Sequence, residues 1–266
     1  FKALGLDCLM LVGGEGTMEI AHRLFEMGVP VIGIPKTIDN DLEMTDYTFG
    51  FQTAVEVASD AMDRLHTTGR SHRRVMILEV MGRNAGWIAL EAGIAGGAHV
   101  ILIPEIPYRI EHVVEKIRLR AEGGSPYSII MVAEGAHEEG GSAIAQESAA
   151  TRLQGVPQLG GVGFYLAAQI QEHIALEVRC TVLGHIQRGG SPCAFDRVLG
   201  TRLGSRAVEA AARGEFGNMV ALRTPEIVLV PLSEIAGKCR TVPLTSQLIH
   251  CAEAIGINLG RPNGFS

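Results

Sequence analysis

Residues 29–42 read VPVIGIPKTIDNDL, a short apolar run that passes directly into a turn rich in Thr, Asp and Asn. Such a run is typical of a buried strand of an open α/β sheet. Asp39 and Asp41 repel each other, so folding gains little from placing two carboxylates this close. A solvated turn, which favours Asp and Asn, explains the stretch. An acidic site at the carboxyl end of a strand, where such sheets place their ligands, explains it as well.

Similar runs recur along the chain and alternate with helical patterns, which indicates βαβ units and mostly parallel sheets. The predicted strands are residues 8–12, 29–34, 74–80, 98–103, 127–133, 178–183 and 219–230, the last of which can divide in two. Helical spacing predicts helices over residues 17–28, 51–69, 108–122, 161–174 and 195–213. Residues 135–161 are rich in Gly, Ser and Glu, and we expect a surface excursion there.

The composition is that of a soluble globular protein. The chain has 266 residues, 47% of them hydrophobic, which suits one large or two medium domains. A net charge of -6 argues against nucleic acid or an anionic membrane as partner, so a bound anion must be held by local basic residues.

The five scattered cysteines favour free thiols in a reducing compartment. Since no run is long enough to span a membrane and the start has no signal-peptide layout, we expect a cytoplasmic protein.

The stretch VGGEGT, residues 12–17, lies between a predicted strand and a predicted helix. Glycines there let backbone amides approach a phosphate, and the helix dipole favours the negative charge. The carboxylate of Glu15 is compatible with a phosphate when Mg²⁺ lies between them. A glycine-rich turn that packs a helix tightly on a sheet explains the stretch equally well.

The acidic turn after residue 34 follows the next strand, so in a parallel sheet it emerges at the same edge as VGGEGT. Phosphoryl transfer to an alcohol needs a base for the hydroxyl proton and a cation that bridges phosphate oxygens. Asp39 can serve as the base, and Asp41 or Glu15 can help to hold Mg²⁺.

Basic side chains lie in two further turns. Arg83, in EVMGRNAGW (residues 79–87), can bind a phosphate with its guanidinium group, although a surface ion pair at a helix start explains it too. His185 and Arg188, in TVLGHIQRGGSP (residues 181–192), can hold a phosphate monoester, although a lone His is more often structural.

Four more charged residues lie near strand ends. Arg179 lies on the strand that precedes the His185 turn, and Glu134 ends the run SIIMVAE, where its carboxylate can bind sugar hydroxyls. Arg73 and Arg74 precede another strand, where most such pairs are simply solvated. Together these positions suit a sugar phosphate.

Taken in order, GGEGT, PKTIDND, EVMGR, VAEG and LGHIQRGGSP resemble the phosphofructokinase family, from residue 1 to about residue 213. GGEGT alone is also similar to the GGDGT of lipid and NAD kinases, but TIDND and GHIQRGG are not shared with those. The resemblance implies two Rossmann-like three-layer αβα halves with mostly parallel sheets. A phosphoryl-donor domain would comprise 1–50 and 187–237, and a sugar-phosphate domain 51–186 and 238–266. It also implies a longer parent protein whose amino-terminal portion is absent here.

The resemblance further implies that Asp39 accepts the proton of the 1-hydroxyl of fructose 6-phosphate and that Arg83 stabilises the transferring phosphoryl group. The implied substrate-binding residues are Thr37, Ile38, Asp39, Arg74, Met81, Gly82, Arg83, Glu134, Arg179, His185 and Arg188. The implied donor-binding residues are Gly14, Glu15, Gly16, Thr17 and Lys36, with Glu15 and Asp41 on Mg²⁺. Residues like Arg74 and Arg179 reach into a neighbouring subunit's site in this family, which implies a homo-oligomer, dimer or tetramer, with sites at the subunit interface.

Three positions bear on the phosphoryl donor. Glu15 stands where the common bacterial form has Asp, which keeps a carboxylate. Lys36 stands where that form has Gly and resembles the pyrophosphate-dependent branch. Gly16 stands where that branch has Asp, whose bulk and charge would oppose the α-phosphate of ATP. We therefore expect ATP as donor, with pyrophosphate as the alternative; a non-catalytic regulatory subunit that binds sugar phosphate is a second alternative.

Overall fold

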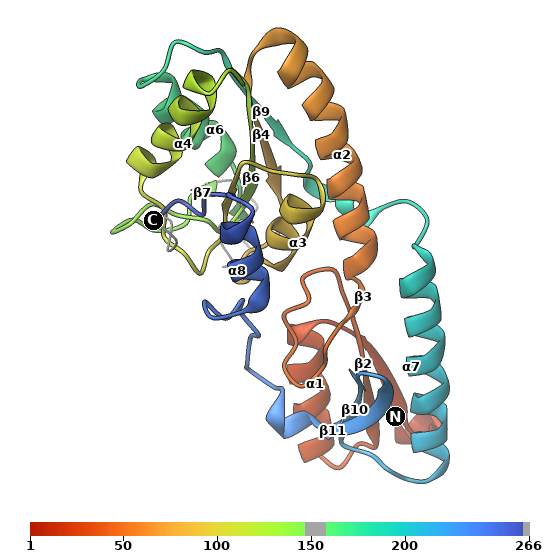
Figure 1. Cartoon of the computed structure of the whole chain (residues 1–266). Helices are drawn as coiled ribbons and strands as arrows, with labels where there is room; N and C mark the ends of the chain where they lie inside the picture. Colours follow the sequence, from red (N-terminus) through yellow and green to blue (C-terminus); the bar gives the residue numbers. More distant parts are fainter. Residues whose placement is uncertain (147–157, 263–266) are drawn as a thin grey trace. The chain divides into compact units, whose positions relative to one another are not determined.

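The computed structural model describes residues 1–146 and 158–262, which form two compact units. Unit 1 comprises Phe1–Thr53 and Ser191–Arg240, and unit 2 comprises Ala54–Gly190 and Thr241–Ser266. Each unit has its own sheet (Figure 1). The assignment of a donor domain and a sugar-phosphate domain to these segments stays a prediction. Within the described residues, no helix is both long and apolar enough to cross a membrane.

The sheet of unit 1 has the strand order β1-β2-β10-β11, with β3 paired to β2. Its strands are β1 (Leu9–Gly13), β2 (Val31–Thr37), β3 (Phe49–Gly50), β10 (Asn218–Arg223) and β11 (Glu226–Pro231). All pairs are parallel except β10 with β11. Its other elements are α1 (Glu15–Glu26), α7 (Ala194–Ala212), η1 (Lys2–Leu4) and η3 (Leu232–Glu234).

Successive residues of β2 point to opposite faces of this sheet, as the pleat requires. Val31 packs with Met18 of α1, and Ile32 packs with Leu199 of α7. The sheet therefore lies between α1 and α7 (Figure 1). Because both faces are covered, β2 begins as a continuous apolar run over residues 31–35 rather than an alternating one.

The sheet of unit 2 is wholly parallel, with the order β5-β6-β4-β9. Its strands are β4 (Val75–Val80), β5 (Val100–Leu102), β6 (Ser128–Ala133) and β9 (Val178–Val182), and a separate two-stranded ribbon contains β7 (Ala145–Gln146) and β8 (Gln158–Leu159). The other elements are α2 (Phe51–His72), which begins in unit 1, α3 (Trp87–Ala95), α4 (Ile110–Glu122), α6 (Val162–Gln171), η2 (Gly184–Arg188) and α8 (Gln247–Ala254).

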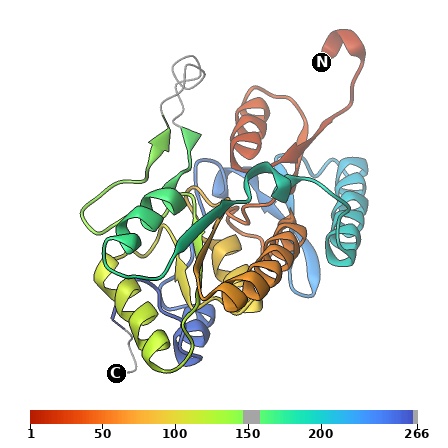
Figure 2. The ribbon, with the colours of Figure 1, turned by 90° about the horizontal axis from the view of Figure 1, so that it is seen from above.

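Helices cover both faces of this second sheet (Figure 2). α4 and α6 pack on one face through residues such as Val113 and Leu166. α2 and α3 pack on the other, where Gly69 and Gly93 bring the helix backbones against strand side chains. Every residue of β4 and β6 is buried, so these central strands hold the turns that follow them in a rigid frame.

The predicted strands and helices are confirmed to within about one helical turn at their ends. Residues 219–230 divide into β10 and β11, which run antiparallel. The helix α8 was not predicted, because its segment of 8 residues is short. Of the expected excursion at 135–161, β7 and β8 are observed, and 147–157 lie outside the described residues.

His99, which follows α3, is a half-buried histidine that favours its neutral form. Its Nδ1 accepts the N–H of Ile129 (2.8 Å), and its ring packs edge-on against His66 and Tyr127. Burial, followed by repulsion from nearby positive charges led by Arg120, lowers the pKa of His99 from 6.5 to about 3. Below pH 6.5 the unfolded chain therefore binds more protons at His99 than the folded chain does. The free energy of unfolding falls for this reason as the pH falls from 6.5 toward 3.

We predict that His99→Asn makes the protein less sensitive to acid. Asn keeps an acceptor for the N–H of Ile129 but does not titrate. Below pH 6.5 the parent should lose stability faster than the variant, by up to about 1 kcal/mol per pH unit, a slope reduced by the ring's partial exposure. Thermal unfolding of both proteins between about pH 4 and pH 8 measures the difference. Curves that stay parallel over this range would contradict the prediction.

Candidate active site

In unit 1, the turn between β1 and α1 approaches the end of β2 closely. Gly14 is the N-cap of α1, and Glu15 is the first helical residue. A Cβ atom on Gly14 would lie 3.2 Å from Cβ of Thr37. The stretch VGGEGT therefore contacts PKTIDND through a position where glycine is the residue that fits most easily.

The loop after β2 holds Asp39 in a defined position. The Thr37 hydroxyl donates to Asp39 Oδ2 and accepts the Asp39 N–H, both at 3.2 Å. Asn40 has a left-handed backbone with φ of 52° and is buried, and its Oδ1 accepts the N–H of Thr48 (3.0 Å). Thr48 in turn donates its hydroxyl to the Thr37 carbonyl oxygen (2.8 Å). These bonds close the loop on itself, so the Asp39 carboxylate stays half-buried rather than extending into solvent.

One cavity of about 440 Å³ lies between the two turns. Its lining residues are Gly14, Glu15, Gly16, Thr17, Ile20, Thr37, Asp39 and Asp41. Lys36 is exposed and Ile38 is buried, and neither is among these lining residues. The carboxylates that the sequence placed in separate turns thus face one cavity.

The electrostatics of this cavity fit a divalent cation. Burial, with repulsion from Asp39 and Glu15, raises the pKa of Asp41 to about 6. Its Oδ1 is buried and makes no hydrogen bond. Among the described residues no three His, Cys, Asp or Glu side chains are grouped as a metal site. This donor set fits Mg²⁺, which takes one or two carboxylates and completes its shell with water and substrate phosphate.

In unit 2, three loops emerge at one edge of the sheet, because β4, β6 and β9 are parallel. Met81, Gly82 and Arg83 follow β4, and Glu134 follows β6 with its N–H bonded to the Val80 carbonyl (2.9 Å). The 3-10 turn η2 follows β9 and carries His185 and Arg188, which are exposed, as Arg83 is. The sheet thus gathers the predicted sugar-phosphate residues at its carboxyl edge.

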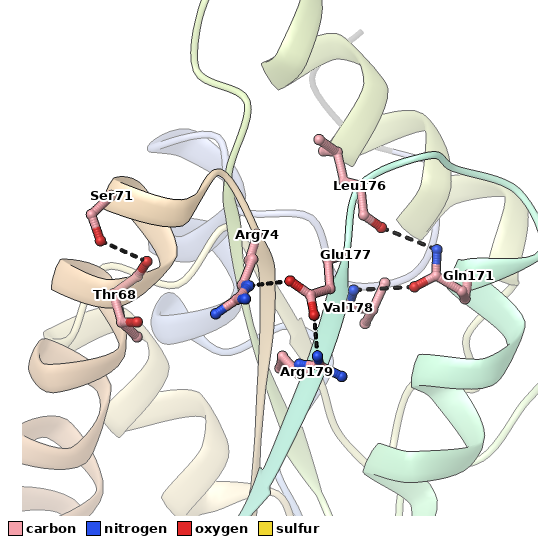
Figure 3. Close-up of polar contacts among 8 residues, drawn as sticks. All are labelled: Thr68, Ser71, Arg74, Gln171, Leu176, Glu177, Val178 and Arg179. Carbon is pink, nitrogen blue, oxygen red and sulfur yellow. Dashed lines mark hydrogen bonds and ion pairs between the residues drawn. The ribbon is translucent and has the colours of Figure 1, made fainter.

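Arg74 and Arg179 lie at the opposite, amino edge of this sheet. Arg74 precedes β4, and Arg179 is the second residue of β9, paired in register with Met76. Both guanidinium groups bind the carboxylate of Glu177, as Figure 3 shows. Within one chain these two arginines therefore do not join the other predicted sugar-phosphate residues; that they serve a neighbouring subunit stays a prediction.

Two supporting residues were missed from sequence. Glu79 of β4 is buried, and its carboxylate accepts the N–H groups of Gly161 (3.0 Å) and Gly163 (2.8 Å), which fixes the start of α6 beside β4. Gly135 donates its N–H to the Gly82 carbonyl (3.0 Å) and so joins the loops after β6 and β4. A lone acidic residue inside the apolar run VMILEV was the signal for Glu79.

The phosphofructokinase family model matches residues 1–211 of this chain. The chain belongs to the phosphofructokinase family. It is 56% identical over 259 residues to an ATP-dependent 6-phosphofructokinase of Chloroflexus aurantiacus (strain J-10-fl), covering 97% of this chain and 70% of that protein. It is 55% identical over 240 residues to a pyrophosphate–fructose 6-phosphate 1-phosphotransferase of Amycolatopsis methanolica, covering 90% of this chain and 70% of that protein.

Solved structures of phosphofructokinases share the fold. A pyrophosphate-dependent phosphofructokinase from Marinobacter aquaeolei matches with a TM-score of 0.79 at 27% identity, covering 97% of this chain and 66% of that one. Pichia pastoris phosphofructokinase matches with a TM-score of 0.72 at 29% identity, covering 96% of this chain and 29% of that one. This phosphofructokinase chain therefore has the α/β fold with mostly parallel sheets that its sequence predicts, and it spans part of the length of these relatives.

Proposed function

We propose that this phosphofructokinase transfers a phosphoryl group from ATP to the 1-hydroxyl of fructose 6-phosphate, with Mg²⁺, giving fructose 1,6-bisphosphate in glycolysis. The observation that carries the proposal is the Asp39 carboxylate, held by Thr37 in a cavity that Glu15, Gly16 and Asp41 also line. The five cysteines form no disulfide within the described residues, which supports action in the cytoplasm.

The unit 1 cavity supplies the base and the donor site. Asp39 accepts the proton of the attacking hydroxyl, and the Thr37 hydrogen bond keeps the carboxylate oriented for this step. Backbone amides at Gly14 and Gly16 bind donor phosphates at the start of α1, with Thr17 lining the same cavity, and the exposed Lys36 reaches the same phosphates. Glu15 and Asp41 would hold Mg²⁺, which would supply positive charge against the phosphate oxygens.

The carboxyl edge of the unit 2 sheet supplies the sugar site. Arg83 stabilises the charge that spreads over the transferring phosphoryl group. Glu134 binds sugar hydroxyls, and His185 and Arg188 bind the 6-phosphate through charge-assisted hydrogen bonds. Met81 and Gly82 line the sugar, and Ile38 supports Asp39 in the substrate loop. Arg74 and Arg179, at the other edge, serve a second copy in a homo-oligomer.

Residue 16 supports ATP as the donor. The relatives quoted above include both donor types at almost equal identity, so overall similarity is a weak guide. Gly16 is exposed at the start of α1, and a Cβ built there meets no atom within 4 Å. Gly16 therefore adds neither bulk nor charge that would oppose the α-phosphate of ATP, which supports ATP as donor.

We predict that Gly16→Asp lowers kcat/KM for ATP by about 10-fold or more, because a carboxylate opposes the α-phosphate. It should leave folding intact, since the added atoms meet open space. Gly16→Ala is the matched control and should keep most of the ATP activity. Steady-state rates with ATP and with pyrophosphate for all three proteins make the test. Turnover of the parent with pyrophosphate alone would refute ATP as donor, and turnover with neither would refute the enzyme assignment.

A further inference from the structure

The chain passes from unit 1 to unit 2 for the last time at residues 240–242, which we name the linker segment. Arg240 is the last residue of unit 1, and Thr241 is the first residue of the returning part of unit 2. None of these residues belongs to the cavity or to the sheet edge described above. Both ends of the linker segment are nevertheless bound to loops that carry proposed catalytic groups.

The unit 1 end of the linker segment is bound to the Asp39 loop. The Arg240 N–H donates to the Asp41 carbonyl at 2.7 Å. Its guanidinium donates through Nε (3.1 Å) and Nη2 (2.8 Å) to the Asn40 carbonyl. Asn40 lies between Asp39 and Asp41 and holds a left-handed backbone conformation. Arg240 therefore fixes the peptide groups that set the directions of both carboxylates.

Charge strengthens this attachment. Arg240 is half-buried, and burial lowers its pKa, while the acidic groups Glu43, Asp46 and Asp41 raise it. The guanidinium in turn lowers the pKa of Asp41, against the larger effect of burial. Hydrogen bonds from a charged donor in a partly desolvated place are stronger than neutral ones.

The unit 2 end of the linker segment is bound to the Arg83 loop through Glu105. The Val242 N–H donates to Glu105 Oε1 at 2.8 Å. The N–H of Gly86 donates to the same carboxylate, at 3.0 Å to Oε1 and 3.2 Å to Oε2. Gly86 ends the turn that begins at Arg83 and is the N-cap of α3. The half-buried carboxylate of Glu105 thus ties the linker segment to the turn that presents Arg83.

We propose that Arg240 and Glu105 are positioning residues that couple the Asp39 loop to the Arg83 loop through the linker segment. The proposal rests on the proposed function for the roles of Asp39 and Arg83. Every hydrogen bond involved lies within one unit, and the connection between the two anchors is the covalent chain of three residues. A displacement of either loop is transmitted to the other because both anchors pull on the same short segment.

The kinetic test uses Arg240→Lys, Glu105→Gln and the double variant. Lys keeps the charge of Arg240 but cannot make its two guanidinium bonds, and Gln places an amide N–H against the N–H of Gly86. Each single variant should lower kcat by roughly 10-fold to 100-fold, since small misplacements of reacting groups have effects of that size. The KM for fructose 6-phosphate should change by less than about threefold, because binding groups remain.

The double variant distinguishes two residues that act through the same segment from two residues whose effects on kcat are independent. If both residues act through the linker segment, the double variant should lose about as much activity as the worse single variant. A loss equal to the product of the two single losses would overturn the proposal. Arg202→Lys is the matched control, because exposed Arg202 also donates to a backbone carbonyl, that of Pro225. It should leave kcat unchanged.

Amide hydrogen exchange tests the coupling without activity. In Glu105→Gln, altered in unit 2, exchange should quicken at the Arg240 and Asp39 amides of unit 1. In Arg240→Lys, it should quicken at the amides of Gly86 and Val242. Changes confined to the altered unit would overturn the proposal, even in a fully active enzyme. If the parent turned over neither donor, the proposed function would fail but the coupling proposal would not. The hydrogen-exchange measurement tests the coupling independently of activity.

Discussion

Asp39→Asn should lower kcat by about 10² to 10⁴-fold while the dissociation constant for fructose 6-phosphate changes little. Asn has the shape of Asp and can still accept the Thr37 hydroxyl through Oδ1, so the loop should keep its geometry. It cannot take a proton, so the attacking hydroxyl would lose its acceptor. The loss therefore falls on the chemical step rather than on binding.

Steady-state kinetics and equilibrium binding of fructose 6-phosphate together measure this effect. Asp63→Asn is a suitable control, because it makes the same chemical change at an exposed position of α2. It should leave both quantities as they are in the parent. If Asp39→Asn turned over at the parental rate, Asp39 would not be the base.

Gly135→Ala should damage the enzyme almost as severely, although Gly135 carries no side chain to contact substrate. A Cβ atom there would lie 2.0 Å from the Arg83 carbonyl oxygen and 3.0 Å from that of Gly82. Both are backbone atoms, so the loop after β4 must move. A displacement of about 1 Å at a reacting group lowers the rate on the order of 10²-fold. Overpacking of this kind also lowers the free energy of unfolding by about 1–3 kcal/mol.

Kinetics and thermal unfolding of Gly135→Ala check the two effects separately. Gly204→Ala provides the comparison, because Gly204 lies inside α7 and a Cβ there meets no atom within 4 Å. That change should raise the free energy of unfolding by roughly 0.5–1 kcal/mol, since alanine favours a helix interior. A Gly135→Ala protein with parental stability and kcat would show that the two loops are not tightly packed.

The elements that frame the site were predictable because their signals are local. Apolar runs such as VPVIGI and VMILEV mark strands covered on both faces, and Gly and Asp mark the turns that end them. The convergence of Glu15 with Asp39 followed from one rule, that neighbouring parallel strands end at the same edge of a sheet. The unit 1 cavity shows that this rule held.

Arg74 and Arg83 were both assigned to the sugar-phosphate site, but they lie at opposite ends of β4. β4 runs between them, so they stand at opposite edges of the sheet. Their spacing in the sequence contains this information once the strand is known. The shared partner Glu177, which binds both Arg74 and Arg179, follows only from the pairing of β4 with β9.

The amino-acid order alone was sufficient for the strands, the polar turns and the residues that resemble a phosphofructokinase site, because each of these is written in contiguous residues. The attachments of Arg240 to Asn40 and of Glu105 to Gly86 and Val242 needed the folded chain. Arg240 and Asn40 are 200 positions apart. Local sequence propensity does not predict which distant backbone carbonyl will accept a hydrogen bond. Burial creates that need only when the units have formed, since a peptide group in water has partners already.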